Sequence, residues 1–120
     1  MAFVVRIKSG IERGVTIALF VTKSAEEACA VEEAASRMFL KCDKERTWAI
    51  CGREFSAAVE EAEALQAKGG AEVKSAHGVG VCIASGLSLR GANTDVLKTV
   101  SASWAVEFNL ALSLVTKKEE

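Results

Sequence analysis

The stretch Val15–Thr22, with the sequence VTIALFVT, alternates between two sets of side chains as a β-strand does. One set consists of large aliphatic residues and the other of threonine, alanine and phenylalanine; the aliphatic set is Val15, Ile17, Leu19 and Val21. The same alternation predicts an earlier strand over residues 2–8. Ser9–Gly14, with a glycine on each side of three residues, has the composition of the connecting turn.

Two helices follow this pair of strands. Ser24-Ala25-Glu26-Glu27 has the form of a capping box, in which Ser24 accepts from a free amide and Glu27 reaches back to the Ser24 amide. It opens a helix predicted at 24–40, and a second helix is predicted at 54–68 after a short strand at 46–51. Lys68-Gly69-Gly70 is a typical helix end. The glutamates of both helices are predicted to lie in solvent.

The C-terminal half is predicted to form a long hairpin. One strand is expected at 71–84, where Gly78 and Gly80 indicate a bulge or the close approach of another backbone. Ser85–Lys98 reads as a loop, and the alternation over 100–116 predicts a last strand that includes Phe108. The order is β-β-α-β-α-β-β, which predicts an α+β two-layer sandwich with both helices on one sheet face.

Length and composition indicate one folded domain. The 120 residues are 50% hydrophobic and 26% charged, which excludes a disordered chain. We assign residues 1–117 to a single α+β domain and 118–120 to a solvated tail. No signal-peptide pattern or membrane span is found, so a cytoplasmic location is expected. Phe3 and Phe20 have no place on a single buried sheet face, which predicts a homodimer or higher homo-oligomer.

The residue types that carry chemistry are not arranged as a catalytic or metal site. No C-x-x-C spacing occurs, and a single histidine, His77, could join the cysteines, which favours reduced thiols over a zinc site. These cysteines are Cys29, Cys42, Cys51 and Cys82. His77 falls inside a predicted strand with no spacing that implies a triad. We therefore expect no enzyme activity, no catalytic residue, no cofactor and no bound metal.

Charge is distributed unevenly between helices and the rest of the chain. The two helix windows contain two of the 15 basic residues and eight of the 16 acidic ones, so the remainder is basic. Positive potential at the loop ends would attract a phosphate backbone. The alternative is that helix surfaces simply favour glutamate, and the sequence pI of 5.9 agrees with it.

Residues from about 15 to 117 resemble the Alba superfamily of small nucleic-acid-binding proteins, which includes the stage V sporulation protein S group. The resemblance is carried by WAICGREFSAAV, residues 48–59, which is similar to the family's strand, Gly-Arg turn and second helix. The spacing from Val21–Ser24 to Gly52-Arg53 is also similar. The family order, β-α-β-α-β-β, is obtained when the strand at 2–8 is treated as an addition.

The resemblance implies a site for DNA or RNA. Lys23 matches the first-loop lysine, Arg53 the arginine of the turn, and Arg90 and Lys98 would lie on the hairpin arm. The chain departs from the family at Ser24 and Cys51, where members carry basic residues. The implied function is non-sequence-specific binding to phosphate backbones. The alternative is a homo-oligomeric structural or regulatory module that binds protein and no nucleic acid.

Overall fold

Two antiparallel strands, β1 (Ala2–Lys8) and β2 (Thr16–Thr22), form the start of the sheet, with Val4 opposite Val21 and Val5 opposite Phe20. Both were predicted and both are confirmed. They belong to a computed structural model that describes residues 2–8, 15–38, 41–42, 48–50, 52–84 and 93–119. The turn predicted at Ser9–Gly14 lies outside the described residues.

The body of the sheet consists of four antiparallel strands in the order β1-β2-β6-β5, so β2 lies inside it. Two short strands, β3 (Lys41–Cys42) and β4 (Trp48–Ile50), pair with successive parts of the other edge of β1. The strand predicted at 46–51 is thereby confirmed at β4.

The strand predicted at 71–84 is instead a hairpin of β5 (Ala71–Lys74) and β6 (Gly78–Cys82). The three residues between them include His77, which therefore lies in a turn and not in a strand. The close backbone approach predicted at Gly78 is confirmed, because a Cβ atom there would collide with the Val21 carbonyl group. A side chain at Gly80 would strike the Phe20 ring.

Helices α1 (Ala25–Arg37) and α2 (Gly52–Ala67) form where the sequence predicted them. The Glu27 amide donates to Ser24 Oγ at 3.2 Å, so the predicted N-cap of α1 is confirmed. Gly69 ends α2 with a φ of 104°, a left-handed conformation that glycine adopts without strain.

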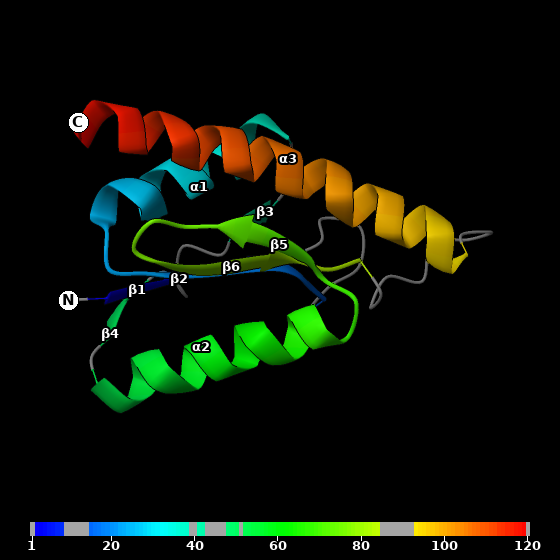
Figure 1. The fold of residues 1–120 in the computed structure, drawn as a ribbon, viewed down its shortest axis with the longest axis horizontal. Coiled ribbons are helices and arrows are strands. Elements are labelled where there is room, and N and C mark those ends of the chain that lie inside the picture. Colours follow the sequence, from blue (N-terminus) through cyan, green and yellow to red (C-terminus); the bar gives the residue numbers. More distant parts are fainter. Residues whose placement is uncertain are drawn as a thin grey trace.

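Helices cover both faces of the sheet (Figure 1). Helix α2 packs against Val4, Leu19 and Val21, whereas α1 packs on the opposite face with Val5 and Phe20. The α+β class is confirmed, but the prediction that the two helices share one face is wrong. The reason is that both side-chain sets of β2 are apolar enough to require cover.

The two phenylalanines that motivated the predicted oligomer find their place within the chain. Phe20 is buried, and its ring centroid lies 4.8 Å from that of Phe108. Phe3 packs against the same cluster. This packing removes the reason that the two phenylalanines gave for expecting a second copy, so an oligomer must be argued from another surface.

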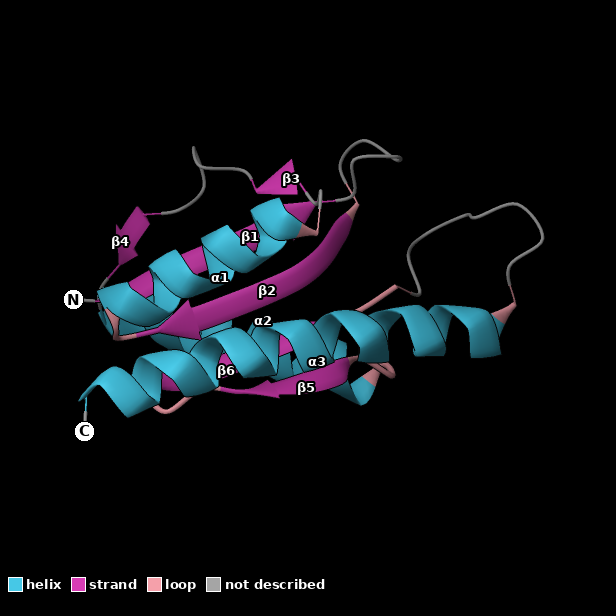
Figure 2. Ribbon diagram, turned by 90° about the horizontal axis from the view of Figure 1, so that it is seen from above, coloured by secondary structure: helices cyan, strands magenta, loops and turns pink. Residues whose placement is uncertain are grey.

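The last predicted strand, 100–116, is wrong, because these residues belong to a long helix, α3 (Thr94–Glu119). It lies beside α1 over β5 and β6 (Figure 2). A strand would place Phe108 and Leu110 on the same face, but Phe108 is buried and Leu110 is 56% exposed. The described part of the predicted loop at 85–98 also differs, since α3 begins at Thr94; residues 85–92 lie outside the described residues.

Several local features explain why this segment is helical. Asn93 accepts a hydrogen bond from the Val96 amide at 3.0 Å, which is N-capping geometry. No glycine or proline occurs after Gly91, and 26 residues far exceed an ordinary strand. The buried positions recur at helical spacing: Ser101, Ala105, Phe108, Ala111 and Leu112. The segment has both the two-residue period of a strand and the period of a helix, and the strand period led to the wrong prediction.

The element order that results is β-β-α-β-β-α-β-β-α when the two short strands are counted. It is not the order β-α-β-α-β-β expected from the resemblance to the Alba superfamily. The long hairpin whose connection was to form a basic arm is absent from the described residues, because its second strand is α3. The helix continues to Glu119, through most of the segment assigned as a tail.

One ion pair joins the sheet to α2. Arg6 Nη1 of β1 lies 2.7 Å from Glu61 Oε1, and Nη2 lies 3.0 Å from Oε2, so the contact is bidentate. The hydrogen bonds from Arg6 hold the pKa of Glu61 below its ordinary value. Because Glu61 is largely exposed, we expect the contact to orient α2 and to contribute at most about 1 kcal/mol.

Replacement of Phe108 by alanine should destabilise the protein by about 3–5 kcal/mol, since the side chain is fully buried against Phe20. The matched variant, Val106→Ala, removes an exposed side chain two residues away and should cost much less. Urea denaturation followed by circular dichroism measures both. Equal losses for the two variants would contradict the helical phase described above.

Candidate interaction surface

The structure brings together two of the four residues that were predicted to bind nucleic acid. Lys23 is exposed, and its Nζ lies 5.1 Å from the centroid of the Phe55 ring in the first turns of α2. Arg53 belongs to that same helix start. The backbones of these two positions therefore lie at one edge of the sheet. The helices nevertheless begin there on opposite faces (Figure 1).

The other two predicted residues do not join them. Lys98 is exposed near the start of α3, at the opposite end of the molecule from the starts of α1 and α2 (Figure 1). Arg90 lies outside the described residues. In the described residues the segment that contains Lys98 is the first part of α3 and not a hairpin arm. A single basic surface containing Lys23 and Lys98 is excluded by their separation.

The edge that contains Lys23 is fixed by Glu27, a residue predicted to be solvated. Glu27 is only 1% exposed, which makes that prediction wrong. Its carboxylate accepts from Thr22 Oγ1 at 2.5 Å, from Ser75 Oγ at 2.8 Å and from the Ala76 amide at 3.1 Å. It thus ties α1 to the β5–β6 turn instead of reaching back to the Ser24 amide, which donates to Thr22 Oγ1.

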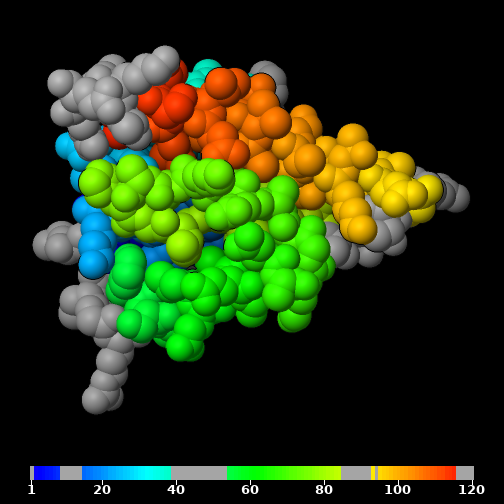
Figure 3. Space-filling view, viewed as in Figure 1, coloured from blue at the N-terminus to red at the C-terminus, as the bar shows by residue number. Residues whose placement is uncertain are grey.

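A row of exposed apolar side chains runs along the outer side of α3. Val106, Leu110 and Leu114 are 57%, 56% and 58% exposed, and their spacing of four residues places them along one side of the helix. Val96 is a further exposed member nearer the helix start. In the space-filling view α3 forms the upper border, and its N-terminal part extends beyond the rest of the protein (Figure 3). This surface was not identified from the sequence, because the segment was interpreted as a strand.

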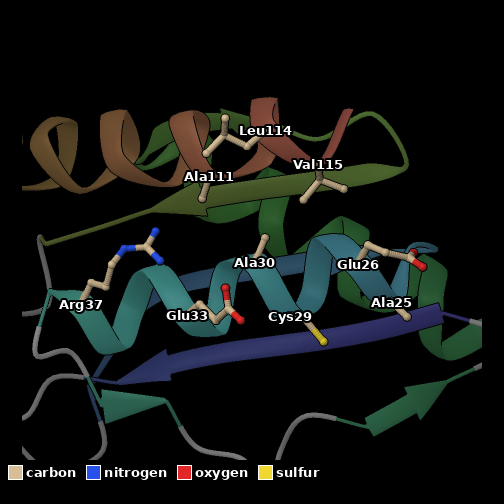
Figure 4. A pocket seen from close by; sticks show the side chains of 9 residues that line it. All are labelled: Ala25, Glu26, Cys29, Ala30, Glu33, Arg37, Ala111, Leu114 and Val115. Carbon is tan, nitrogen blue, oxygen red and sulfur yellow. The ribbon is translucent and has the colours of Figure 1, made fainter. Parts of the chain in front are cut away.

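An open groove borders this row, between α1 and α3. It has a volume of about 630 Å³ and is lined by small and apolar side chains with a few charged ones (Figure 4). Ala25, Cys29 and Ala30 contribute from α1, and Leu114 and Val115 from α3. The short α1 side chains leave the space open, and Leu114 belongs to both the groove and the row. The apolar surface is therefore continuous from α3 onto α1.

Neither a metal site nor a membrane span is found among the described residues. No three histidine, cysteine, aspartate or glutamate side chains there lie together as metal ligands would. No helix in those ranges, α3 included, has the length and the apolar composition needed to cross a bilayer.

The groove predicts a difference in reactivity between two cysteines. Cys29 is exposed at its border, whereas burial raises the pKa of the Cys82 thiol to about 12. A maleimide should modify Cys29 in the native protein within minutes and leave Cys82 unmodified until the protein unfolds. Peptide mass mapping after labelling with and without denaturant measures this. Modification of Cys82 at the rate of Cys29 would contradict the packing described here.

Comparisons of the chain with protein-family models, with curated proteins and with solved structures find no match.

Proposed function

We propose that this protein is a homo-oligomeric interaction module whose contact surface is the outer row of α3. The observation that carries the proposal is the exposure of Val106, Leu110 and Leu114 to more than half of their area along one helix side. Isolated exposed apolar residues are ordinary, but a continuous row indicates a contact surface.

The composition of α3 supports the same function. From Val100 to Val115 the helix contains one charged residue, Glu107. A helix on the surface of a monomer usually has a polar outer side. The outer side of α3 instead includes three large apolar side chains, Val106, Leu110 and Leu114. Val106, Leu110 and Leu114 are already partly covered, so burying the rest of each would stabilise an assembly by about 1–2 kcal/mol for each side chain.

Val106→Glu should shift the protein toward the monomer, because it places a charge within the apolar row. We expect sedimentation velocity over a wide concentration range to show an assembly for the parent and a monomer for the variant. Because Val106 is exposed, the substitution should leave the circular dichroism spectrum unchanged.

Ala64→Glu is the matched control, since Ala64 is exposed on α2, which packs on the other face of the sheet. It adds the same charge to a helix surface and should leave the assembly unchanged. A parent protein that remains monomeric at millimolar concentration would refute the proposed function.

A second function, phosphate-backbone binding, is favoured by the position of Lys23 beside the start of α2. Two helix N-termini converge on this edge, and their free amides and positive dipole ends attract anions. The exposed carboxylates of Glu26 and Glu54 act against such binding. The support is therefore smaller than for α3, and any affinity should be modest.

Lys23→Ala and Arg53→Ala should each weaken binding to duplex DNA. Each lost phosphate contact should also reduce the slope of log affinity against log salt by about 0.9. Fluorescence anisotropy with labelled DNA and RNA at several salt concentrations measures this. Lys98→Ala serves as the control, because Lys98 lies at the far end of the molecule. If the parent binds neither DNA nor RNA at low salt, this second function is wrong.

A further inference from the structure

We infer that Asn109 of α3 blocks the outer edge of β5, so that an extended polypeptide cannot add to the sheet there. The inference goes beyond the proposed function, because it concerns the sheet edge and not the outer row of α3. It follows from the position of β5 in the sheet, from the direction of its backbone amides and from one hydrogen bond that crosses from α3 to β5.

Strand β5 is the last strand on its side of the sheet. It pairs with β6 along one edge, and the described residues place no further strand along its other edge (Figure 2). On the opposite side of the sheet, β1 is partly covered by β3 and β4. An edge strand presents backbone N–H and C=O groups that can pair with another chain. The β5 edge is therefore a position at which this sheet could be extended.

The direction of the backbone groups of β5 follows from its pairing. In an antiparallel ladder, successive residues direct their N–H and C=O groups alternately toward the neighbouring strand and away from it. The Lys74 amide donates to Asn109 Oδ1 at 2.9 Å, so it points away from β6. Because Glu72 precedes Lys74 by two residues, its backbone groups also point away from β6. An added strand would bind these two residues.

Asn109 occupies the position that an added strand requires. A carbonyl oxygen of the incoming strand would have to accept the Lys74 amide hydrogen, which Asn109 Oδ1 already accepts in a hydrogen bond of ordinary length. The carboxamide group of Asn109 also fills the space in which that carbonyl group would lie. A strand can therefore pair with Lys74 only if the Asn109 side chain moves away.

Asn109 differs in this respect from the hydroxyl residues of α3. Thr99, Ser101 and Ser113 donate to carbonyl groups of their own helix. Asn109 instead accepts from a backbone amide 35 residues earlier in the chain. It directly follows Phe108, which is fully buried against the sheet. The packing of Phe108 fixes the rotation of α3 and thereby holds the next side chain at the β5 edge.

Two other features of β5 disfavour pairing with a further strand. The strand has only four residues, and the exposed side chains of Glu72 and Lys74 are charged. Short length and charge are both common on protected edge strands. Neither feature satisfies a backbone donor of the edge, whereas the Asn109 contact does so for Lys74.

Hydrogen exchange in the parent protein tests the contact directly. The Lys74 amide should be protected several-fold more than the Glu72 amide, which also points outward but has no such acceptor among the described residues. In Asn109→Ala the protection of Lys74 should fall to that of Glu72. Two-dimensional NMR after transfer to deuterium oxide measures both amides. Equal protection of the two amides in the parent would overturn the inference.

The rate of assembly tests whether the contact blocks the edge. Asn109 is only half-buried, so the alanine variant should fold, and it should assemble several-fold faster than the parent at the same high concentration. Light scattering measures the rate, and infrared spectroscopy identifies β-structure formed between molecules. Faster assembly without such β-structure would contradict strand addition and overturn the inference.

Two control variants separate an open edge from other effects of substitution. Thr99→Ala removes a polar side chain of α3 that bonds within its own helix, and it should assemble like the parent. Val31→Ala truncates a fully buried side chain of α1 and lowers stability without changing the β5 edge. If Asn109→Ala assembles no faster than either control, the inference is wrong.

The same measurements keep this inference separate from the proposed function. Contacts through the outer row of α3 would be common to the parent and to all three variants, so only the differences between them concern the β5 edge. A parent that is monomeric at every concentration refutes the proposed function and leaves the exchange and assembly tests of Asn109 fully decisive.

Discussion

The burial of β2 on both faces is the constraint on which the rest of this structure depends. Leu19 and Val21 face α2, while Phe20 faces Phe108 of α3 at a centroid distance of 4.8 Å. A strand that is apolar on both sides cannot lie at a wet face, so cover is needed above and below it. Because α1 lies over β1 and β2, a second helix is needed over β5 and β6, and α3 supplies it.

Close backbone contact between β2 and β6 makes this arrangement possible. Gly78 lies against the Val21 carbonyl group, and Gly80 leaves room for the Phe20 ring that reaches toward α3. At the end of β2, Glu27 binds Thr22 and the β5–β6 turn at the same time. One buried carboxylate thus fixes the start of α1, the end of β2 and the hairpin turn relative to one another.

The candidate interaction surface is a consequence of the same packing. Helix α3 uses one side to cover the sheet, and its Phe108 and Leu112 are buried there. The remaining apolar residues, Val106, Leu110 and Leu114, necessarily project outward, because a helix cannot place them on the same side as Phe108. A helix that carries large apolar side chains on its outer side as well as its inner side therefore completes the core of the chain and still presents a contact surface. The basic edge at Lys23 lacks this combination of size and continuity.

Local signals in the sequence determined the first two strands, the N-cap at Ser24, the start of α2 and its end at Gly69. Each depends on neighbouring residues alone, through alternation, capping or backbone conformation. The α+β class followed from the order of these elements along the chain.

Only the tertiary structure decided which face each helix covers and what Ala102–Leu114 becomes. That segment alternates like a strand and also repeats like a helix, so its own residues do not distinguish the two. The choice follows from the sheet face that needs cover. Phe108, Ala111 and Leu112 are spaced so that a helix packs all three on that face, while Val106 and Leu110 remain exposed. Glu27 was misplaced for a related reason, because its partners Ser75 and Ala76 are 48 and 49 residues away in the chain. The outer row of α3 was also missed, because its residues lie along one side of the chain only when the segment is helical.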